Sequence, residues 1–351
     1  MKGRLRGHAL SASIFFFVVS VASMAPASAV ACEELGLEVS GPTMATSSVK
    51  GTLCREGSLE GKALQLLIPG IVANRSYFDL PIQPSTYSYA RKAAESGYVS
   101  LAIDRIGTGS SDRPPFLLVD LDLNVSVITQ VIEALRAGVV ADTRFDRILI
   151  VGHSFGGLIA ARIAEDGGAP LSGIALTGVS HEFNSDVLPA AATGFYPAQL
   201  DAKFGVSVPV GYLTNPPGVR EDVLFQPGNY DPAVAAADEA LKDTVTIPEL
   251  LQLGDGLDDR TTEIAVPVFM GLGQFDRVFC ASSIDCSSAE GLRESEAPFF
   301  SPSACLHTYV LANAGHYESL HLNAGDFHNE LLAWANARVG PDVAIPSPGC
   351  P

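Results

Sequence analysis

A serine lies between glycines in the stretch RILIVGHSFGGLIAARIAEDGG, residues 147–168, where an apolar run meets an Ala-rich segment. Gly152-His-Ser154-Phe-Gly156 fits the pattern G-x-S-x-G, in which a sharp turn from a strand into a helix exposes the serine hydroxyl. Such a turn strains the backbone, so the flanking positions need residues without bulky side chains. An ordinary Gly-Ser turn is the alternative, but the apolar run before it and the helical pattern after it favour Ser154 as a nucleophile.

A serine hydroxyl reacts poorly at neutral pH unless a base takes its proton and an acid orients that base. Around Ser154, and over about residues 60–340, the chain resembles the α/β-hydrolase family. The resemblance implies the chain order serine, then aspartate or glutamate, then histidine. Asp276 follows VPVFMGLGQF and His316 follows LHTYVLANAG, so each lies just past an apolar run typical of a strand. The resemblance therefore implies a triad of Ser154, Asp276 and His316.

Other residues compete for the two downstream roles. His321 is the alternative base, and Glu182 or Asp186, near the end of an earlier predicted strand, is the alternative acid. Gly-His directly after the last predicted strand favours His316. The run G-x-G-x-x-D after an apolar strand favours Asp276.

Acyl transfer puts negative charge on a carbonyl oxygen, which two backbone N–H groups must face. The resemblance implies one donor at Phe155, where the helix begins, and one in the loop after the first core strand. That loop reads IPGIVAN, residues 68–74, and has Pro69 where many relatives have histidine. Because the donor is a backbone group, Ile71 is still expected to supply it, with Gly70 allowing the close approach.

Short apolar runs alternate with helix-length segments from residue 63 onward, which predicts an α/β fold with a mostly parallel β-sheet and helices on both faces. Core strands are expected at 63–68, 98–103, 147–151, 173–177, 266–272 and 306–311. Helices are expected at 85–96, 124–136, 155–165 and 324–339. Two weaker strand candidates precede them, at 35–39 and 47–54. The loop DRIGTGSS, residues 104–111, also resembles the family and is expected to be structural.

The alternation breaks over residues 181–265, which are rich in Pro, Gly and aromatic residues. A structureless loop of that length is uncommon inside a domain, so an inserted cap or lid is predicted, with a helix at 232–241. Its aromatic side chains fit two roles, closing an apolar pocket over the triad or forming the cap's own small core. The hydrolase core then comprises 30–180 and 266–340, followed by a tail at 341–351.

The first 29 residues predict a secretory signal peptide, because three basic residues precede an apolar run at 9–24 and an A-x-A site at 27–29. That run has 16 residues, fewer than the roughly 20 needed to span a bilayer. The predicted location is therefore extracellular or periplasmic, without stable membrane insertion after cleavage. Lipidation of Cys32 is the minor alternative, since AVAC faintly resembles a lipoprotein cleavage site.

All six cysteines follow the predicted signal peptide, which indicates up to three disulfides in an exported protein. Metal binding fits poorly because no Cys-x-x-Cys pair occurs. Cys32 with Cys54 is the preferred pairing, and Cys350 is expected to pin the tail. Three cysteines lie between the predicted acid and base, in a loop longer than the family usually has. No metal and no cofactor are expected.

The chain carries a formal charge of −17, which argues against binding nucleic acid or anionic membrane surfaces. Haloalkane dehalogenases and epoxide hydrolases of the family use an aspartate nucleophile, so Ser154 argues against both. The leading hypothesis is a carboxylic ester hydrolase acting on a small-molecule or lipid-like ester through an acyl-enzyme. An amidase, lactonase, polyester hydrolase or acyltransferase would use the same triad, and a non-catalytic binding protein is the alternative of another class.

Overall fold

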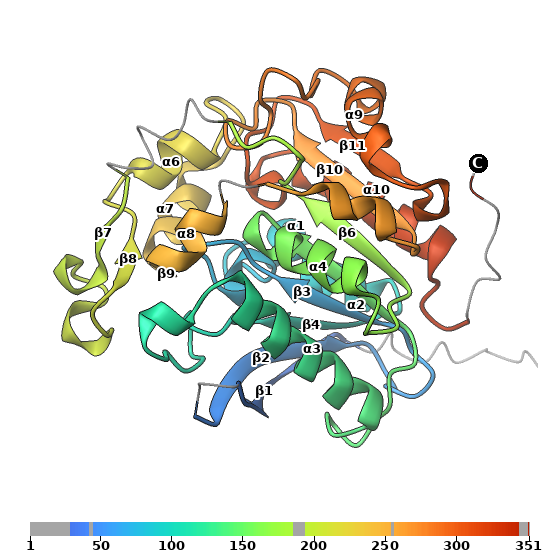
Figure 1. Cartoon of the computed structure of the whole chain (residues 1–351), viewed down its shortest axis with the longest axis horizontal. Helices are drawn as coiled ribbons and strands as arrows, with labels where there is room; N and C mark the ends of the chain where they lie inside the picture. Colours follow the sequence, from blue (N-terminus) through green and yellow to red (C-terminus); the bar gives the residue numbers. More distant parts are fainter. Residues whose placement is uncertain (1–28, 42–44, 185–193, 254–255, 344–349, 351) are drawn as a thin grey trace, which may run out of the picture.

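The computed structural model describes residues 29–41, 45–184, 194–253, 256–343 and 350, with an eight-stranded β-sheet at its centre (Figure 1). In chain order its strands are β1 (Ala31–Val39), β2 (Ser47–Arg55), β3 (Leu64–Ile68), β4 (Val99–Ile103), β5 (Ile148–His153), β6 (Gly173–Thr177), β10 (Val268–Gly273) and β11 (His307–Leu311). They lie side by side in the order β1-β2-β4-β3-β5-β6-β10-β11. The predicted signal peptide, except for its last residue, lies outside the described residues.

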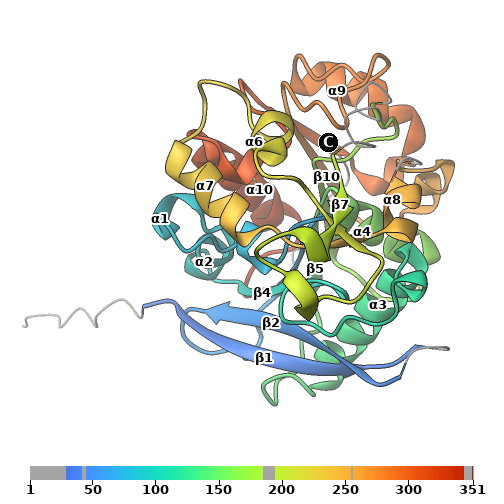
Figure 2. The same ribbon diagram turned by 90° about the vertical axis from the view of Figure 1, so that its left-hand side faces the viewer.

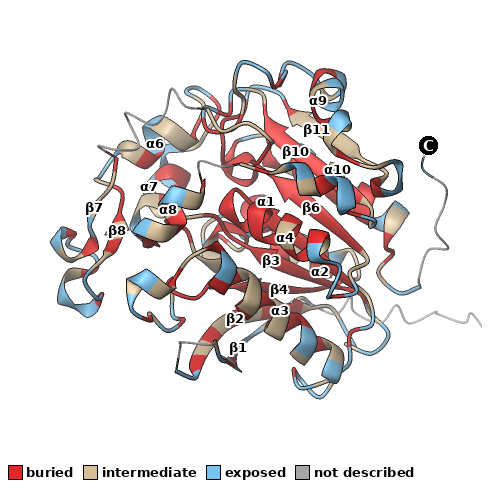
Figure 3. Cartoon of the chain, in the orientation of Figure 1, coloured by how far each residue is buried: buried red, intermediate tan, exposed pale blue. Residues whose placement is uncertain are grey.

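The strands from β4 to β11 pair in parallel, whereas β1 and β2 form an antiparallel hairpin whose second strand is antiparallel to β4. This confirms the predicted α/β fold and its mostly parallel sheet. Every residue of β3, β4, β5, β6 and β10 is buried, as expected for strands covered on both faces (Figure 3).

Helices cover both faces of the sheet, and each face has its own apolar cluster. Helices α3 (Leu121–Ala137) and α4 (Phe155–Asp166) contribute to one cluster, and α2 (Tyr89–Glu95) and α10 (Ala324–Arg338) to the other. Strand β3 supplies both, since Leu64, Leu66 and Ile68 point to the first cluster and Leu67 to the second. Successive side chains of β3 thus pack on opposite faces of the sheet.

One predicted helix is broken in two. Instead of a continuous helix at 85–96, the chain forms α1 (Pro84–Tyr87) and then α2. Ser88, between them, has an extended backbone (φ −94°, ψ 101°), and its hydroxyl accepts a hydrogen bond from the Arg91 N–H. Ser88 is therefore the N-cap of α2, and an N-cap residue does not itself adopt helical angles.

Residues 181–265, called the cap segment below, lie between β6 and β10. They form a small antiparallel sheet of β7 (Tyr196–Pro197), β8 (Tyr212–Thr214) and β9 (Val245–Thr246). They also form α6 (Val219–Leu224), α7 (Pro232–Leu241) and α8 (Ile247–Leu253). In Figure 1 the segment lies to the left of the large sheet, and in Figure 2, viewed from that side, it faces the reader. Its standing as a separate domain stays a prediction.

Three disulfides are present, Cys32–Cys54, Cys280–Cys286 and Cys305–Cys350. The first joins directly opposite residues of β1 and β2, in agreement with the preferred pairing. The second closes part of the long loop after β10, which also contains helix α9 (Ala289–Glu296). No helix among the described residues is long and apolar enough to cross a membrane.

Candidate active site

Ser154 lies at the turn between β5 and α4, with φ 54° and ψ −121°. Its N–H donates to the Thr177 carbonyl at 2.8 Å, which ties the turn to β6. A Cβ at Gly152 would lie 2.2 Å from the Gly156 carbonyl oxygen, and a Cβ at Gly156 would lie 2.1 Å from the Ile68 oxygen. Since real Cβ atoms do not approach so closely, any side chain at either glycine would disrupt the turn that presents the serine.

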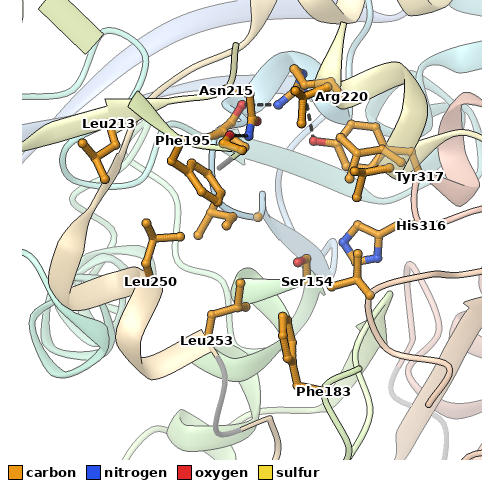
Figure 4. Close-up of a pocket in the computed structure, with 18 of the residues that line it drawn as sticks. Ser154, Phe183, Phe195, Leu213, Asn215, Arg220, Leu250, Leu253, His316 and Tyr317 are labelled. Atoms are coloured by element: carbon orange, nitrogen blue, oxygen red, sulfur yellow. Dashed lines mark hydrogen bonds between the residues drawn. The ribbon is translucent and has the colours of Figure 1, made fainter. Parts of the chain in front are cut away.

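Asp276 and His316 are brought together by the loops after β10 and β11. A carboxylate oxygen of Asp276 lies 2.8 Å from His316 Nδ1, and both residues are buried. The other oxygen accepts from the N–H groups of Val278 and Phe279 at 2.7 and 3.1 Å. With Nδ1–H donating to the carboxylate, Nε2 is the imidazole nitrogen available as a proton acceptor. His316 and Ser154 line the same cavity (Figure 4).

The two loops approach each other closely because Gly273, the last residue of β10, has no side chain. A Cβ there would lie 2.0 Å from the Gly315 carbonyl oxygen. The Phe275 N–H also donates to the Ala314 carbonyl at 2.8 Å. The residues just before Asp276 are thus hydrogen-bonded to those just before His316, which holds the two loops together.

His321, the alternative base, uses both ring nitrogens in structural hydrogen bonds. Its Nε2 accepts from the N–H groups of Gln226 and Gly315, each at 3.0 Å, and its Nδ1 lies 2.8 Å from the Tyr317 carbonyl oxygen. Burial lowers the pKa of His321 to about 4. These contacts connect the cap segment with the loop that carries His316, and they leave neither nitrogen free to take a proton from a serine.

Of the two alternative acids, Glu182 is described and Asp186 lies outside the described residues. A carboxylate oxygen of Glu182 accepts from the Ser283 N–H at 3.1 Å. The Asp276 carboxylate, by contrast, contacts His316 directly. Of these acids, Asp276 is the one that the described residues bring to the histidine.

Acidification is expected to destabilise the fold through His321. Between pH 6.5 and 4 the unfolded chain protonates this histidine and the folded chain does not, so its contribution is complete above about pH 6.5 and is lost as pH falls towards 4. We expect the contribution of His321 to the free energy of unfolding to fall by up to about 1.4 kcal/mol per pH unit in this window. Urea unfolding at pH 7 and pH 5 measures the loss, and His321→Gln, whose amide can both accept and donate, should reduce it. An equal loss in the variant would contradict the assignment.

The two residues predicted as oxyanion donors both adjoin the nucleophile. Phe155 is the first residue of α4, and Ile71 lines the cavity together with Ser154. A Cβ at Gly70 would lie 2.9 Å from Ser154 Cβ, so the loop after β3 lies directly against the serine. That the N–H groups of Ile71 and Phe155 bind an oxyanion stays a prediction.

The cavity over Ser154 has a volume of about 440 Å³ and is mostly apolar. Phe183 and Phe195 of the cap segment face it, in agreement with the first role considered from the sequence, whereas Phe225 is buried against Tyr317 and His321 outside the cap segment (Figure 4). Its remaining apolar side chains are Ile71, Val72, Leu213, Val219, Val223, Leu224, Ile247, Leu250, Leu251, Leu253 and Val278. Among the described lining residues, Arg220 is the one arginine, and no lysine, aspartate or glutamate lines the cavity; Arg220 is paired with Asp238.

A buried polar cluster behind the histidine has no counterpart in the sequence expectations. His153 Nδ1 lies 3.2 Å from the Tyr77 hydroxyl and 3.5 Å from a Glu318 carboxyl oxygen. Burial, then the nearby Asp276 charge, raises the pKa of Glu318 well above its usual value, and burial lowers that of His153 well below its own. Both shifts favour the neutral form of the group, and both groups lie behind the Asp276–His316 pair.

Residues 65–330 match the alpha/beta hydrolase family, and the chain belongs to that family. An esterase from Thermogutta terrifontis has a similar structure, with a TM-score of 0.60 at 14% identity over 87% of this chain and 98% of that one. An enol-lactonase from Burkholderia xenovorans LB400 gives 0.57 at 14% identity over 83% and 97%. A carboxylesterase from Bacillus subtilis gives 0.55 at 14% over 86% and 90%. Among curated proteins, none matches the chain in sequence. These likenesses show the fold.

Proposed function

We propose that this chain is a serine hydrolase that cleaves carboxylic esters through an acyl-enzyme on Ser154. The observation that carries the proposal is the 2.8 Å contact between Asp276 and His316 Nδ1, because this histidine shares one cavity with a serine held on a glycine-flanked turn. The family membership supports hydrolysis, and the esterase neighbours agree with an ester substrate. The type of bond that is cleaved depends on the active-site residues and not on the fold, because enzymes with this fold catalyse many different reactions.

In the proposed reaction, His316 Nε2 takes the hydroxyl proton as Ser154 Oγ attacks the ester carbonyl carbon. The N–H groups of Ile71 and Phe155 stabilise the oxyanion of the tetrahedral intermediate. His316 then gives the proton to the departing alcohol, leaving an acyl-enzyme. Water attacks the acyl carbon with the same histidine as base, and the acid product leaves. Throughout, Asp276 holds the imidazole and stabilises its charged form.

The lining of the cavity favours an uncharged ester substrate with an apolar acyl or alcohol group. Its described lining is mostly aliphatic and aromatic, and Arg220 is already neutralised by Asp238, so a substrate carboxylate would find no free cation there. A volume of about 440 Å³ accommodates a medium-sized ester within the 300–1,000 Å³ range usual for ligand pockets.

We also propose that the chain is exported. The pattern of residues 1–29 supports a cleaved signal peptide, and the three disulfides are compatible with an oxidising compartment. The mature chain would then begin close to β1, whose Cys32 is disulfide-bonded and so not available for lipidation.

The test treats purified protein with a fluorophosphonate and locates the adduct by peptide mass, alongside turnover of p-nitrophenyl esters from acetate to palmitate. We expect a single adduct on Ser154 and a rate that peaks at a chain length the cavity accommodates. A matched lactone and anilide of the preferred acyl group separate ester cleavage from lactonase and amidase activity. No adduct and no turnover across the panel would overturn the proposal and favour the binding protein.

A further inference from the structure

A buried arginine contacts both sides of the proposed oxyanion hole. Arg105, in the loop after β4, is fully buried, and its Nε donates to the Pro69 carbonyl at 3.0 Å. Its Nη2 donates to the Gly70 carbonyl at 3.2 Å. The same guanidinium lies 5.1 Å from the ring centroid of Phe155. One side chain thus touches the loop after β3 and the first residue of α4.

The peptide between Gly70 and Ile71 carries both the carbonyl that Arg105 binds and the N–H that is predicted to bind the oxyanion. In a trans peptide the carbonyl and the following N–H point in opposite directions within one plane. A hydrogen bond from Arg105 to the Gly70 oxygen therefore determines where the Ile71 N–H points. With the Ile71 N–H facing the oxyanion as predicted, a rotation of this peptide would turn the carbonyl oxygen there instead, and a negative dipole would lie where the oxyanion forms.

A second buried arginine reaches the same loop from the cap segment. Arg220 on α6 is 1% exposed, and its Nη1 donates to the Val72 carbonyl at 2.8 Å. Its Nη2 also donates to the Tyr317 hydroxyl at 2.9 Å (Figure 4). Since Tyr317 follows His316 directly, Arg220 joins the oxyanion loop to the loop of the proposed base.

Val72 has a backbone conformation that needs such support. Its φ is 48°, in the left-handed region that a β-branched residue rarely adopts. Its carbonyl accepts a second hydrogen bond, from the Asp243 N–H at 2.9 Å. Both donors, Arg220 and Asp243, belong to the cap segment. A strained backbone conformation persists where the surrounding contacts hold it in place. For Val72, the hydrogen bonds from the cap segment provide these contacts.

Each arginine is neutralised by a carboxylate of the cap segment. Arg105 forms an ion pair with Glu249 of α8, which is 1% exposed. Arg220 forms two hydrogen bonds with Asp238 of α7, at 2.9 and 2.7 Å. Buried ion pairs cost desolvation and are weak devices for stability alone, so their placement against one loop calls for another explanation.

We propose that Arg105 and Arg220 are positioning residues that hold the loop after β3 with the Ile71 N–H turned towards the oxyanion, and that the cap segment is a structural part of this oxyanion hole. The inference rests on the proposed function. It assigns the cap segment a role beyond covering substrate, because Asp238 and Glu249 hold the two guanidinium groups in place. Neither arginine touches the reacting atoms.

The test compares Arg105→Lys, Arg220→Lys and a control, Arg147→Lys. Lysine keeps the positive charge but lacks the planar fork that reaches two acceptors at once. Arg147 likewise donates to backbone carbonyls, those of Gly61 and Gly340 at 2.7 and 2.6 Å, but it precedes β5, at the end of the sheet away from Ser154. The control therefore loses similar hydrogen bonds without touching the oxyanion loop.

Each variant is measured for kcat and KM on p-nitrophenyl butyrate, per active site titrated with the fluorophosphonate. Two inhibitors of one chain length are also compared, a trifluoromethyl ketone, whose serine adduct carries an oxyanion, and the unreactive methyl ketone. For both site variants we expect kcat to fall by about 10- to 100-fold, with trifluoromethyl ketone affinity falling in parallel. KM and methyl ketone affinity should change by no more than about threefold. The control should keep the wild-type kcat and both affinities.

Variants that keep kcat within about twofold of wild type, or that lose no more than Arg147→Lys, would overturn the inference while leaving the hydrolase proposal intact. Inactive wild-type protein would overturn both. If a lysine variant does not fold, Glu249→Gln and Asp238→Asn replace it, since each weakens the hold on one arginine without removing it. They should show the same paired loss of kcat and trifluoromethyl ketone affinity, and unchanged values would count against the proposal.

Discussion

Replacing Ser154 with alanine is expected to lower kcat for p-nitrophenyl butyrate by about 10⁶-fold, because no acyl-enzyme can form without the hydroxyl oxygen. The protein should still fold, since alanine has the same Cβ and the turn depends on the glycines on either side of it. Thermal unfolding by circular dichroism should therefore match that of wild type within a few degrees. The phosphonate adduct should disappear from the peptide that contains residue 154.

A matched control is Ser100→Ala. Ser100 lies on β4, is fully buried and is outside the cavity lining. Its hydroxyl donates to the Ala90 carbonyl at 2.8 Å. Its loss should lower the melting temperature and leave kcat unchanged, because a buried hydrogen bond contributes about 1 kcal/mol to folding and nothing to the reaction. Turnover by Ser154→Ala at more than a thousandth of the wild-type rate would show that another residue is the nucleophile.

The centre of the sheet was predictable from the sequence because β3, β4, β5, β6 and β10 are buried on both faces. A strand covered on both sides is a mostly apolar run, and LQLLI and GIALT, each with one polar residue, are such runs beside turn residues. Helices α3 and α4 of the core were predictable for a related reason, since both have apolar side chains at helical spacing. Local sequence is sufficient for elements of this kind.

The short helices of the cap segment were not predictable in the same way. Helices α6 and α8 have six and seven residues, too few to show a clear period. Both are held by distant contacts, for example Arg220 of α6 with Val72 and Glu249 of α8 with Arg105. Only α7, which begins with Asp-Pro and is Ala-rich, carries its own start signal, and its predicted bounds of 232–241 match the structure.

In the candidate site, too, some residues were predictable from local sequence and others were not. Ser154, Asp276 and His316 each lie within a local pattern of glycines at the end of an apolar run, so the sequence is enough to nominate them. Arg105 was noticed only as part of a loop expected to be structural. Its contacts are with Pro69 and Gly70, more than thirty residues away in the chain. No spacing in the sequence predicts these contacts. Positioning residues of this kind become visible in three dimensions.

Replacing His316 with alanine is expected to cost about as much as loss of the serine, about 10⁶-fold in kcat, because nucleophile and base act as one unit. The loss should be similar at every pH, since no other imidazole takes over. His321 is the histidine to compare, because it is only five residues away and yet accepts two backbone hydrogen bonds at its Nε2. In His321→Gln we expect a lower melting temperature and a kcat, per titrated active site, within about tenfold of wild type.

The pair of variants separates a proton acceptor from a structural support. Added imidazole should restore part of the activity of His316→Ala, because the small molecule can occupy the space beside Ser154 and Asp276. It should do nothing for His321→Gln, whose defect lies in the hold of the cap segment on the loop around Gly315. Equal losses of kcat in both variants, or imidazole rescue of His321→Gln, would mean that the base has been misassigned. The Asp276 contact would then serve the fold, and the proton from Ser154 would pass to another group.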